Sequence, residues 1–440
     1  MNRSRGAVGA ALLCLVLAAC GNAATSSSPP APPTMRPPPP PSLAPSPTPP
    51  ASPTAAEITV LRSRLATNPN DQGALRDLGL ALLQRVRETA DPSLYGQADE
   101  AFDRARRLVA DDPLILIGVG GLQLGRHEFA EALETGRAAL AALPELPAAR
   151  AIEVDALVEL GRYEEAGKAL DDLVALRPDI VSLPRLSYLR ELHGDIDGAI
   201  EAMRRAVASP GLAPENTAYV TSLLGTLLVR DGDAKGGRTA YNDALAIIPD
   251  HAPSLAGLGR LAVAEGDLAS AMDDFGRASA ILPLPEYVVA LGEAREAAGD
   301  AAGSADAYAL ARAEIALFEA AGTQVDLELA LFESDHGDPF RALSLARTAY
   351  ERTPTIRAAD ALGWALHRLG RNAEARERAD EALRLGTRDP LLLFHRGAIL
   401  AALGDAPAAR RDLVLALEID AGFSATGAAE ARRILAGLGA

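Results

Sequence analysis

The chain has 440 residues but only two cysteines, Cys14 and Cys20, and both precede residue 21. The remainder therefore has no disulfide, no thiolate nucleophile and no cysteine ligand for zinc. Aromatic residues make up only 4% of the chain, which disfavours β-sandwich cores and favours closely packed helices rich in Ala and Leu. The composition predicts an all-α protein.

Basic residues are also scarce. Lys and Arg number 43 against 59 Asp and Glu, which gives a formal net charge of −16. Because contacts to phosphates need a basic face, this balance argues against binding of nucleic acid, including the RNA binding of some helical repeats.

The N-terminus has the pattern of a targeting segment. Arg3 and Arg5 precede an apolar run from Ala7 to Ala19, which has the length of a signal-peptide core and is too short to span a bilayer. The run ends in Leu17-Ala18-Ala19-Cys20-Gly21, which resembles the lipobox of bacterial lipoproteins. The resemblance implies a signal peptide over residues 1–19 and a lipid on Cys20, whereas an ordinary secretory signal with an incidental cysteine is the alternative.

A proline-rich segment follows. From Ser26 to Thr54 the chain consists largely of Pro, Ser, Ala and Thr, with an unbroken run from Pro37 to Pro41 and no apolar periodicity. Residues 20–54 are therefore predicted to form an unpacked stalk. Roughly 34 residues at about 3.1 Å each would reach on the order of 100 Å as polyproline II, and a plain disordered linker is equally compatible with the composition.

Residues 55–440 contain an internal repeat of about 34 residues. Small residues stand five positions after its glycines, as at Ala166, Ala199 and Ala271, and prolines end most of the second helices. Aspartate directly follows six of the glycines, where a carboxylate can cap the next helix. The glycines are 33 to 38 residues apart: Gly161, Gly194, Gly232, Gly266, Gly299, Gly337, Gly370 and Gly404.

This pattern resembles the tetratricopeptide repeat family, which has a Leu-Gly pair in its first helix, as at Leu258-Gly259, a glycine turn, a small residue in the second helix and a closing proline. The resemblance implies an all-α, right-handed superhelical solenoid of about ten helix-turn-helix units over residues 55–440. Eight units are regular; two less regular ones precede them, and the first carries an apparent ten-residue insertion near residues 85–97. Residues 55–67 would form an opening half-unit, and Ala428 to Leu438 a C-terminal capping helix.

Histidines beside acidic residues raise the question of a chemical site. His193-Gly194-Asp195 and Asp335-His336-Gly337-Asp338 both fall on turns between helices, where Gly and Asp recur without His. Turn formation and helix capping therefore explain them better than metal binding. We predict no metal, no cofactor and no catalytic residues, and hence that the protein is not an enzyme.

In tetratricopeptide repeat arrays, the inner face of the first helix typically lines a concave groove that binds peptides or protein segments. Trp364, with Arg368 one helical turn beyond, is expected to contribute to binding more than to folding, because neither belongs to the small-residue seam. Projection of the inner face onto this chain gives a groove set of nine residues: Tyr188, Tyr219, Arg230, Arg260, Glu293, Asp360, Trp364, His367 and Arg368.

Together these patterns predict an extracytoplasmic scaffold, at the cell surface or in a periplasm, that is anchored to a membrane by its lipid and binds a protein or peptide partner in its groove. The alternative is a solenoid of the cell envelope that binds a small molecule or glycan, with or without catalysis. A deep polar pocket with titratable groups in contact would favour that alternative.

Overall fold

The computed structural model describes residues 52–439, which contain 22 α-helices and no β-strand. The all-α class is therefore confirmed. None of these helices combines the length and apolar character needed to cross a membrane. The predicted signal peptide, the lipid site Cys20 and all but the last residues of the predicted stalk lie outside the described residues, so the predicted division of the N-terminal region stays a prediction.

Twenty of the helices form ten consecutive pairs, which confirms the predicted repeat number. The unpaired helices are α1 (Pro53–Thr67) at the start and α22 (Ala425–Gly437) at the end, close to the predicted half-unit and capping helix. The pairs are α2 (Gln72–Thr89) with α3 (Ser93–Leu108), α4 (Pro113–Gly125) with α5 (Phe129–Ala142), α6 (Pro147–Glu159) with α7 (Tyr163–Leu176), α8 (Leu183–Leu192) with α9 (Ile196–Val207), α10 (Pro214–Arg230) with α11 (Ala234–Ile247), α12 (Ala252–Glu265) with α13 (Leu268–Ile281), α14 (Pro285–Ala297) with α15 (Ala301–Ala320), α16 (Asp326–His336) with α17 (Pro339–Arg352), α18 (Ile356–Arg368) with α19 (Asn372–Ala382), and α20 (Pro390–Ala402) with α21 (Ala406–Ile419).

The turn within each regular pair follows from its Gly-Asp sequence. Gly194 has a φ of 76°, in the left-handed region that only glycine enters without a steric cost. The next residue, Asp195, caps α9, and its carboxylate accepts a hydrogen bond from the backbone N–H of Gly198 at 3.0 Å. Small residues such as Ala199, which is completely buried, then allow the two helices to pack closely.

The apparent insertion near residues 85–97 does not form a loop. Its residues lengthen the first pair, so that α2 has 18 residues and α3 has 16. Helix α15 is also long, with 20 residues, which accounts for the wide spacing before Gly337. Near the end of α15, Phe318 packs against both the core of α1–α4 and the core of α12–α14, so the long helices join parts of the array that are distant in sequence.

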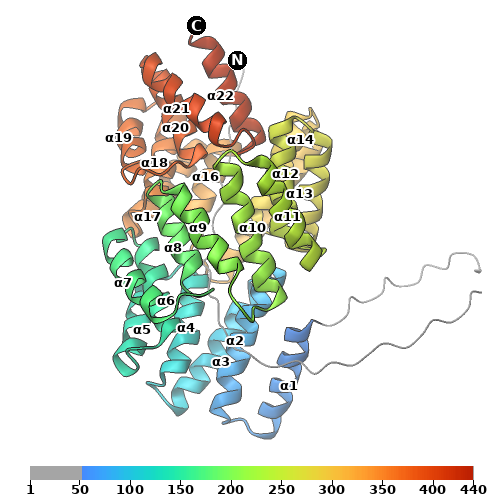
Figure 1. The fold of residues 1–440 in the computed structure, drawn as a ribbon, viewed down its shortest axis with the longest axis vertical. Helices are drawn as coiled ribbons and strands as arrows, with labels where there is room; N and C mark the ends of the chain where they lie inside the picture. The colour runs from blue at the N-terminus through green and yellow to red at the C-terminus, as the bar shows by residue number, and fades with distance from the viewer. Residues whose placement is uncertain (1–51, 440) are drawn as a thin grey trace, which may run out of the picture.

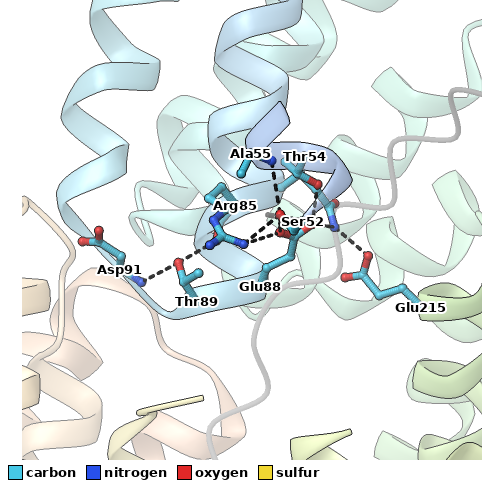
Figure 2. Close-up of polar contacts among 9 residues, drawn as sticks. Ser52, Thr54, Ala55, Arg85, Glu88, Thr89, Asp91 and Glu215 are labelled. Carbon is cyan, nitrogen blue, oxygen red and sulfur yellow. Dashed lines mark hydrogen bonds and ion pairs between the residues drawn. The ribbon is translucent and has the colours of Figure 1, made fainter. Parts of the chain in front are cut away.

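A polar clasp fixes the start of α1 to the end of α2 (Figure 2). The hydroxyl of Ser52 donates to Glu88 at 3.1 Å, Thr54 donates to the same carboxylate, and Arg85 donates to it at 2.8 Å. Burial opposes the charge of Glu88, but these bonds outweigh it and hold the pKa of the carboxyl below its ordinary value. The first described residues are thus bound to the solenoid.

The array winds back onto itself, so that its second turn lies directly on its first (Figure 1, where α6 and α7 lie below α17). The backbone N–H of Ile356 donates to the hydroxyl of Tyr163 at 3.1 Å, across 193 residues of sequence. Similarly, the backbone N–H of Gln324 donates to the carbonyl of Arg126 at 3.0 Å. Buried residues of α18–α20, among them Ile356, join one hydrophobic core with those of α4–α10.

The C-terminal segment spans the superhelix as well as capping it. Helix α22 packs against α20 and α21, as a capping helix should, and also against α14. Its N-cap residue Ser424 donates to Glu293 on α14 at 2.7 Å. Gly422, just before α22, lies so close to the carbonyl of Arg260 on α12 that a Cβ there would be 2.1 Å from the oxygen. The end of the chain therefore ties α12 and α14 to α20 and α21.

Candidate functional site

The structure divides the projected groove set into two groups. Tyr188, Tyr219, Arg230 and Arg260 are half-buried and belong to a polar cluster on the inner side of the superhelix. The other five residues lie in or beside a second, more deeply buried cluster on α14–α20. We call the first group the inner polar cluster and define it by Glu159, Tyr188, Glu191, Tyr219, Arg230, Arg260, Glu286, Arg357 and Asp389.

The inner polar cluster joins the two turns of the superhelix electrostatically. Arg230 at the end of α10 forms an ion pair with Glu191 on α8, and its guanidinium also lies 3.6 Å from the carboxylate of Asp389 before α20. Their side chains are 16–22% exposed, so the charges are partly shielded from water. Asp389 has a second role, because it caps α20 by accepting from the backbone N–H of Leu391 at 2.9 Å.

Arg357 on α18 is the other cation shared by this cluster. Burial works against its charge, but Tyr188, Asp389 and Glu159 outweigh burial and hold the pKa of the guanidinium above its ordinary value. The balance differs at Glu286, where burial raises the pKa of the carboxyl to about 7 despite the opposing charges of Arg260 and Arg357. The cluster thus contains a carboxyl that titrates near neutral pH.

The second cluster is built around Trp364, and we call it the tryptophan cluster. The indole N–H of Trp364 donates to Asp335 on α16 at 2.7 Å, and its ring stacks on His395 of α20 with centroids 4.0 Å apart. Nδ1 of His395 lies 2.9 Å from a carboxylate oxygen of Asp360. Arg368 covers the other part of the indole at 5.7 Å. Helices α16, α18 and α20 are therefore held together by one network of stacked rings and hydrogen bonds.

The accessible position expected for Trp364 is wrong. Its side chain is 0% exposed, and Asp360 and Glu293 are only 3% and 2% exposed. The projection treated α18 as an isolated helix with an open inner face, whereas α16 and α20 flank it and their side chains meet over the indole. His367 and Arg368 stay half-buried. The binding of a partner by the nine residues stays a prediction.

Several residues of the site were missed from sequence. Arg357 stands in the first turn of a helix and has the pattern of an ordinary solvated side chain, and Asp389 has that of a simple N-cap. Glu159 ends α6 without any motif. All three meet only because the two turns of the superhelix pack together. A local repeat pattern carries no information on contacts of that range.

The histidine motifs on the turns behave largely as predicted. Asp195 and Asp338 cap α9 and α17 through backbone N–H groups, and residues 52–439 contain no group of three or more His, Cys, Asp or Glu side chains arranged to hold a metal ion. His336 differs from the expected exposed turn residue. Its side chain is fully buried, stacked on Tyr308 at 4.0 Å and 3.6 Å from the carboxylate of Glu293.

Changing Asp335 to Asn should stabilise the protein, and the gain should grow as pH rises. Burial raises the pKa of the Asp335 carboxyl well above its ordinary value of 3.8, aided by Glu293 and opposed by Arg368. The folded state therefore keeps a proton that the unfolded chain loses, and stability falls above pH 3.8, up to the folded pKa, by at most about 1.4 kcal/mol per pH unit. Asparagine keeps an acceptor for Trp364 and removes this loss.

Urea unfolding across a pH series measures the effect. The matched control is Asp306→Asn on the exposed face of α15, for which the difference from the parent should stay small at every pH. A pH-independent difference for Asp335→Asn would show that the carboxyl is already ionised in the folded protein.

Comparisons with known proteins agree with this architecture. Residues 153–215 and 361–425 match the family model described as Tetratricopeptide repeat. No curated protein matches the chain.

Three solved structures illustrate the likeness. A thermophilic tetratricopeptide repeat protein of Thermus thermophilus is 23% identical, with 43% of this chain and 97% of that chain covered and a TM-score of 0.38. The type IV pilus biogenesis factor PilW is 16% identical over 46% and 92% of the two chains, with a TM-score of 0.39. The Cut9–Hcn1 hetero-tetramer of the APC/C is 13% identical over 88% and 90%, with a TM-score of 0.40. With ten helix pairs in register and family matches in both halves of the array, the chain belongs to the tetratricopeptide repeat family.

Proposed function

We propose that the protein is a scaffold of the cell envelope, anchored by a lipid on Cys20, that holds a protein or peptide partner on its solenoid and is not an enzyme. The repeat array itself carries the proposal. Ten helix pairs take up nearly all of residues 72–419, and arrays of this kind present extended surfaces for binding. The acidic composition favours a partner other than nucleic acid.

Arg260 is the member of the groove set best placed to contact a partner. It is half-buried on α12, and its side chain forms no ion pair or hydrogen bond within residues 52–439. By contrast, Arg230 is already bound to Glu191. A guanidinium of this kind can form a bidentate pair with a carboxylate of the partner.

Chemical cross-linking in intact cells, followed by purification of the full-length protein, tests the scaffold proposal. A partner should be recovered with the parent and in smaller amount with Arg260→Ala. Arg277→Ala, on the exposed side of α13, is the matched control and should leave recovery unchanged. Repeated failure to cross-link any partner to the parent would contradict the proposal.

Membrane anchoring has its own test. Changing Cys20 to Ala should release the protein from membranes or stall its processing, because the thiol is the proposed site of acylation and one or more acyl chains supply the membrane affinity. Cys14→Ala, inside the predicted signal peptide, should have no such effect. Partitioning into the detergent phase that is the same for Cys20→Ala and the parent would refute the lipid anchor.

A small-molecule or glycan-binding solenoid is the less supported function. The largest polar cavity in the described part of the chain has a volume of about 60 Å³. Since one water needs about 10–15 Å³ by this measure, the cavity holds a few waters and is too small for a sugar chain.

A further inference from the structure

That cavity lies where the two turns of the superhelix meet. The first turn contributes His127 from the α4–α5 connection, Glu159 from α6 and Tyr188 from α8. The second turn contributes Gln324 and Glu328 around the start of α16, and Arg357 from α18. With about 60 Å³ of space, it can take the end of one side chain or a few waters, but not a helix or strand.

His127 occupies a position that glycine holds elsewhere in the array. It stands between the end of one helix and the cap of the next, as Gly161 does, and has a φ of 59°. A non-glycine residue in this left-handed region is strained and persists only when its surroundings fix it. Here Nδ1 lies 2.9 Å from the carbonyl of Gln324, to which it must donate, and the ring stacks on Phe129. The second ring nitrogen is then an acceptor.

Two acceptor oxygens in the wall of this cavity have no hydrogen-bond partner. Both Oε2 of Glu328 and Oε1 of Gln324 are inaccessible to solvent and unpaired. The other oxygen of Glu328 is 4.0 Å from Nδ1 of His127, which is beyond hydrogen-bond distance. Buried acceptors without donors are unfavourable, so the site is suited to a ligand that brings several N–H donors.

The charges in the wall favour a cation. Of its two arginines, Arg352 is bound to Asp326 at 2.8 Å. Arg357 is shared among Tyr188, Asp389 and Glu159, and no positive side chain is dedicated to Glu328. Burial, the largest influence, also raises the pKa of the Glu159 carboxyl above its ordinary value even with Arg357 nearby. The cavity therefore has more carboxylate than cation to balance it.

We propose that this cavity binds a primary ammonium group, carried either by a lysine side chain of the partner or by a small free amine. An ammonium is compact and has three donors, which can meet the unpaired oxygens of Glu328 and Gln324 together with one further acceptor. The lysine source rests on the proposed scaffold function, whereas the free-amine source does not.

Calorimetric titration of the full-length protein tests the site with three probes. These are n-butylamine, the peptide N-acetyl-Ala-Lys-Ala-amide, and the same peptide acetylated on the lysine Nζ. Binding of butylamine alone identifies a small-amine site, and binding of the lysine peptide identifies a partner side chain. The acetylated peptide should not bind, because it lacks the charge. Binding of neither amine, or equal binding of the acetylated peptide, would overturn the proposal.

Glu328→Gln should weaken binding by about tenfold or more, since a hydrogen bond to a charged group is lost. Because Glu328 already has an unpaired oxygen, this variant should fold, as an unchanged melting temperature would show. The matched control is Glu131→Gln on the exposed side of α5, which should bind like the parent. Unchanged affinity in Glu328→Gln would also overturn the proposal. If cross-linking recovers a partner equally with the parent and Glu328→Gln, the scaffold function stands and the lysine source fails.

Discussion

Replacing Gly194 with alanine should lower the free energy of unfolding by about 2–5 kcal/mol, whereas the same change at Gly232 should cost only about 1–2 kcal/mol. Both glycines are on equivalent turns and have positive φ, 76° and 88°, so alanine suffers the same backbone strain at each. Around Gly232 there is open space, but a Cβ on Gly194 would lie 2.3 Å from the carbonyl oxygen of Gly386 on the second turn of the superhelix.

The difference between the two variants therefore isolates the contact between turns. Urea unfolding gives the two free energies, and small-angle scattering should show an expanded particle for Gly194→Ala alone. Gly161→Ala should behave like Gly194→Ala, since its Cβ would lie 2.7 Å from the carbonyl oxygen of Pro354. Equal costs at Gly194 and Gly232, with unchanged scattering, would mean that the two turns do not touch in solution.

Trp364→Ala should be about as destabilising, at about 3–5 kcal/mol, because it removes a fully buried large side chain. It also leaves the Asp335 carboxyl without the indole donor and His395 without its stacked ring. This outcome is the opposite of what the inner-face projection implied, namely a loss of affinity with little change in melting temperature.

Thermal unfolding distinguishes the two expectations. Phe340→Ala is the matched control, since this aromatic residue is 74% exposed at the start of α17 and should melt like the parent. Trp364→Phe should recover part of the stability through stacking, but not the hydrogen bond to Asp335. A small shift for Trp364→Ala would restore Trp364 to an accessible groove.

The architecture could be predicted because each repeat records its own local structure. The Gly-Asp turns, the buried alanines such as Ala199 and the prolines at helix starts each act within one or two units. The insertion near residues 85–97 was located correctly but its form was not, because extra residues can lengthen two helices as readily as they form a loop. The lengths of α2 and α3 depend on packing with the rest of the array.

The site was harder to predict, because it depends on which units meet after the chain has turned. Tyr188 and Arg230 were correctly placed on the inner side, but their neighbours Arg357 and Asp389 come from units about 160 residues or more further on. Trp364 was assigned to the inner side by its angle on the helix alone. The rings and carboxylates of α16 and α20 that bury it follow no repeat rule.

The contacts between the turns also bear on how this protein can change over evolution. An open solenoid can gain or lose a whole repeat, because each repeat contacts only its neighbours. Here His127 meets Gln324 across 197 residues, and Tyr163 meets Ile356 across 193. Deleting one repeat between these partners would set every residue of the second turn against the wrong unit of the first. The chain should therefore accept many substitutions on its surface while keeping its number of central repeats fixed.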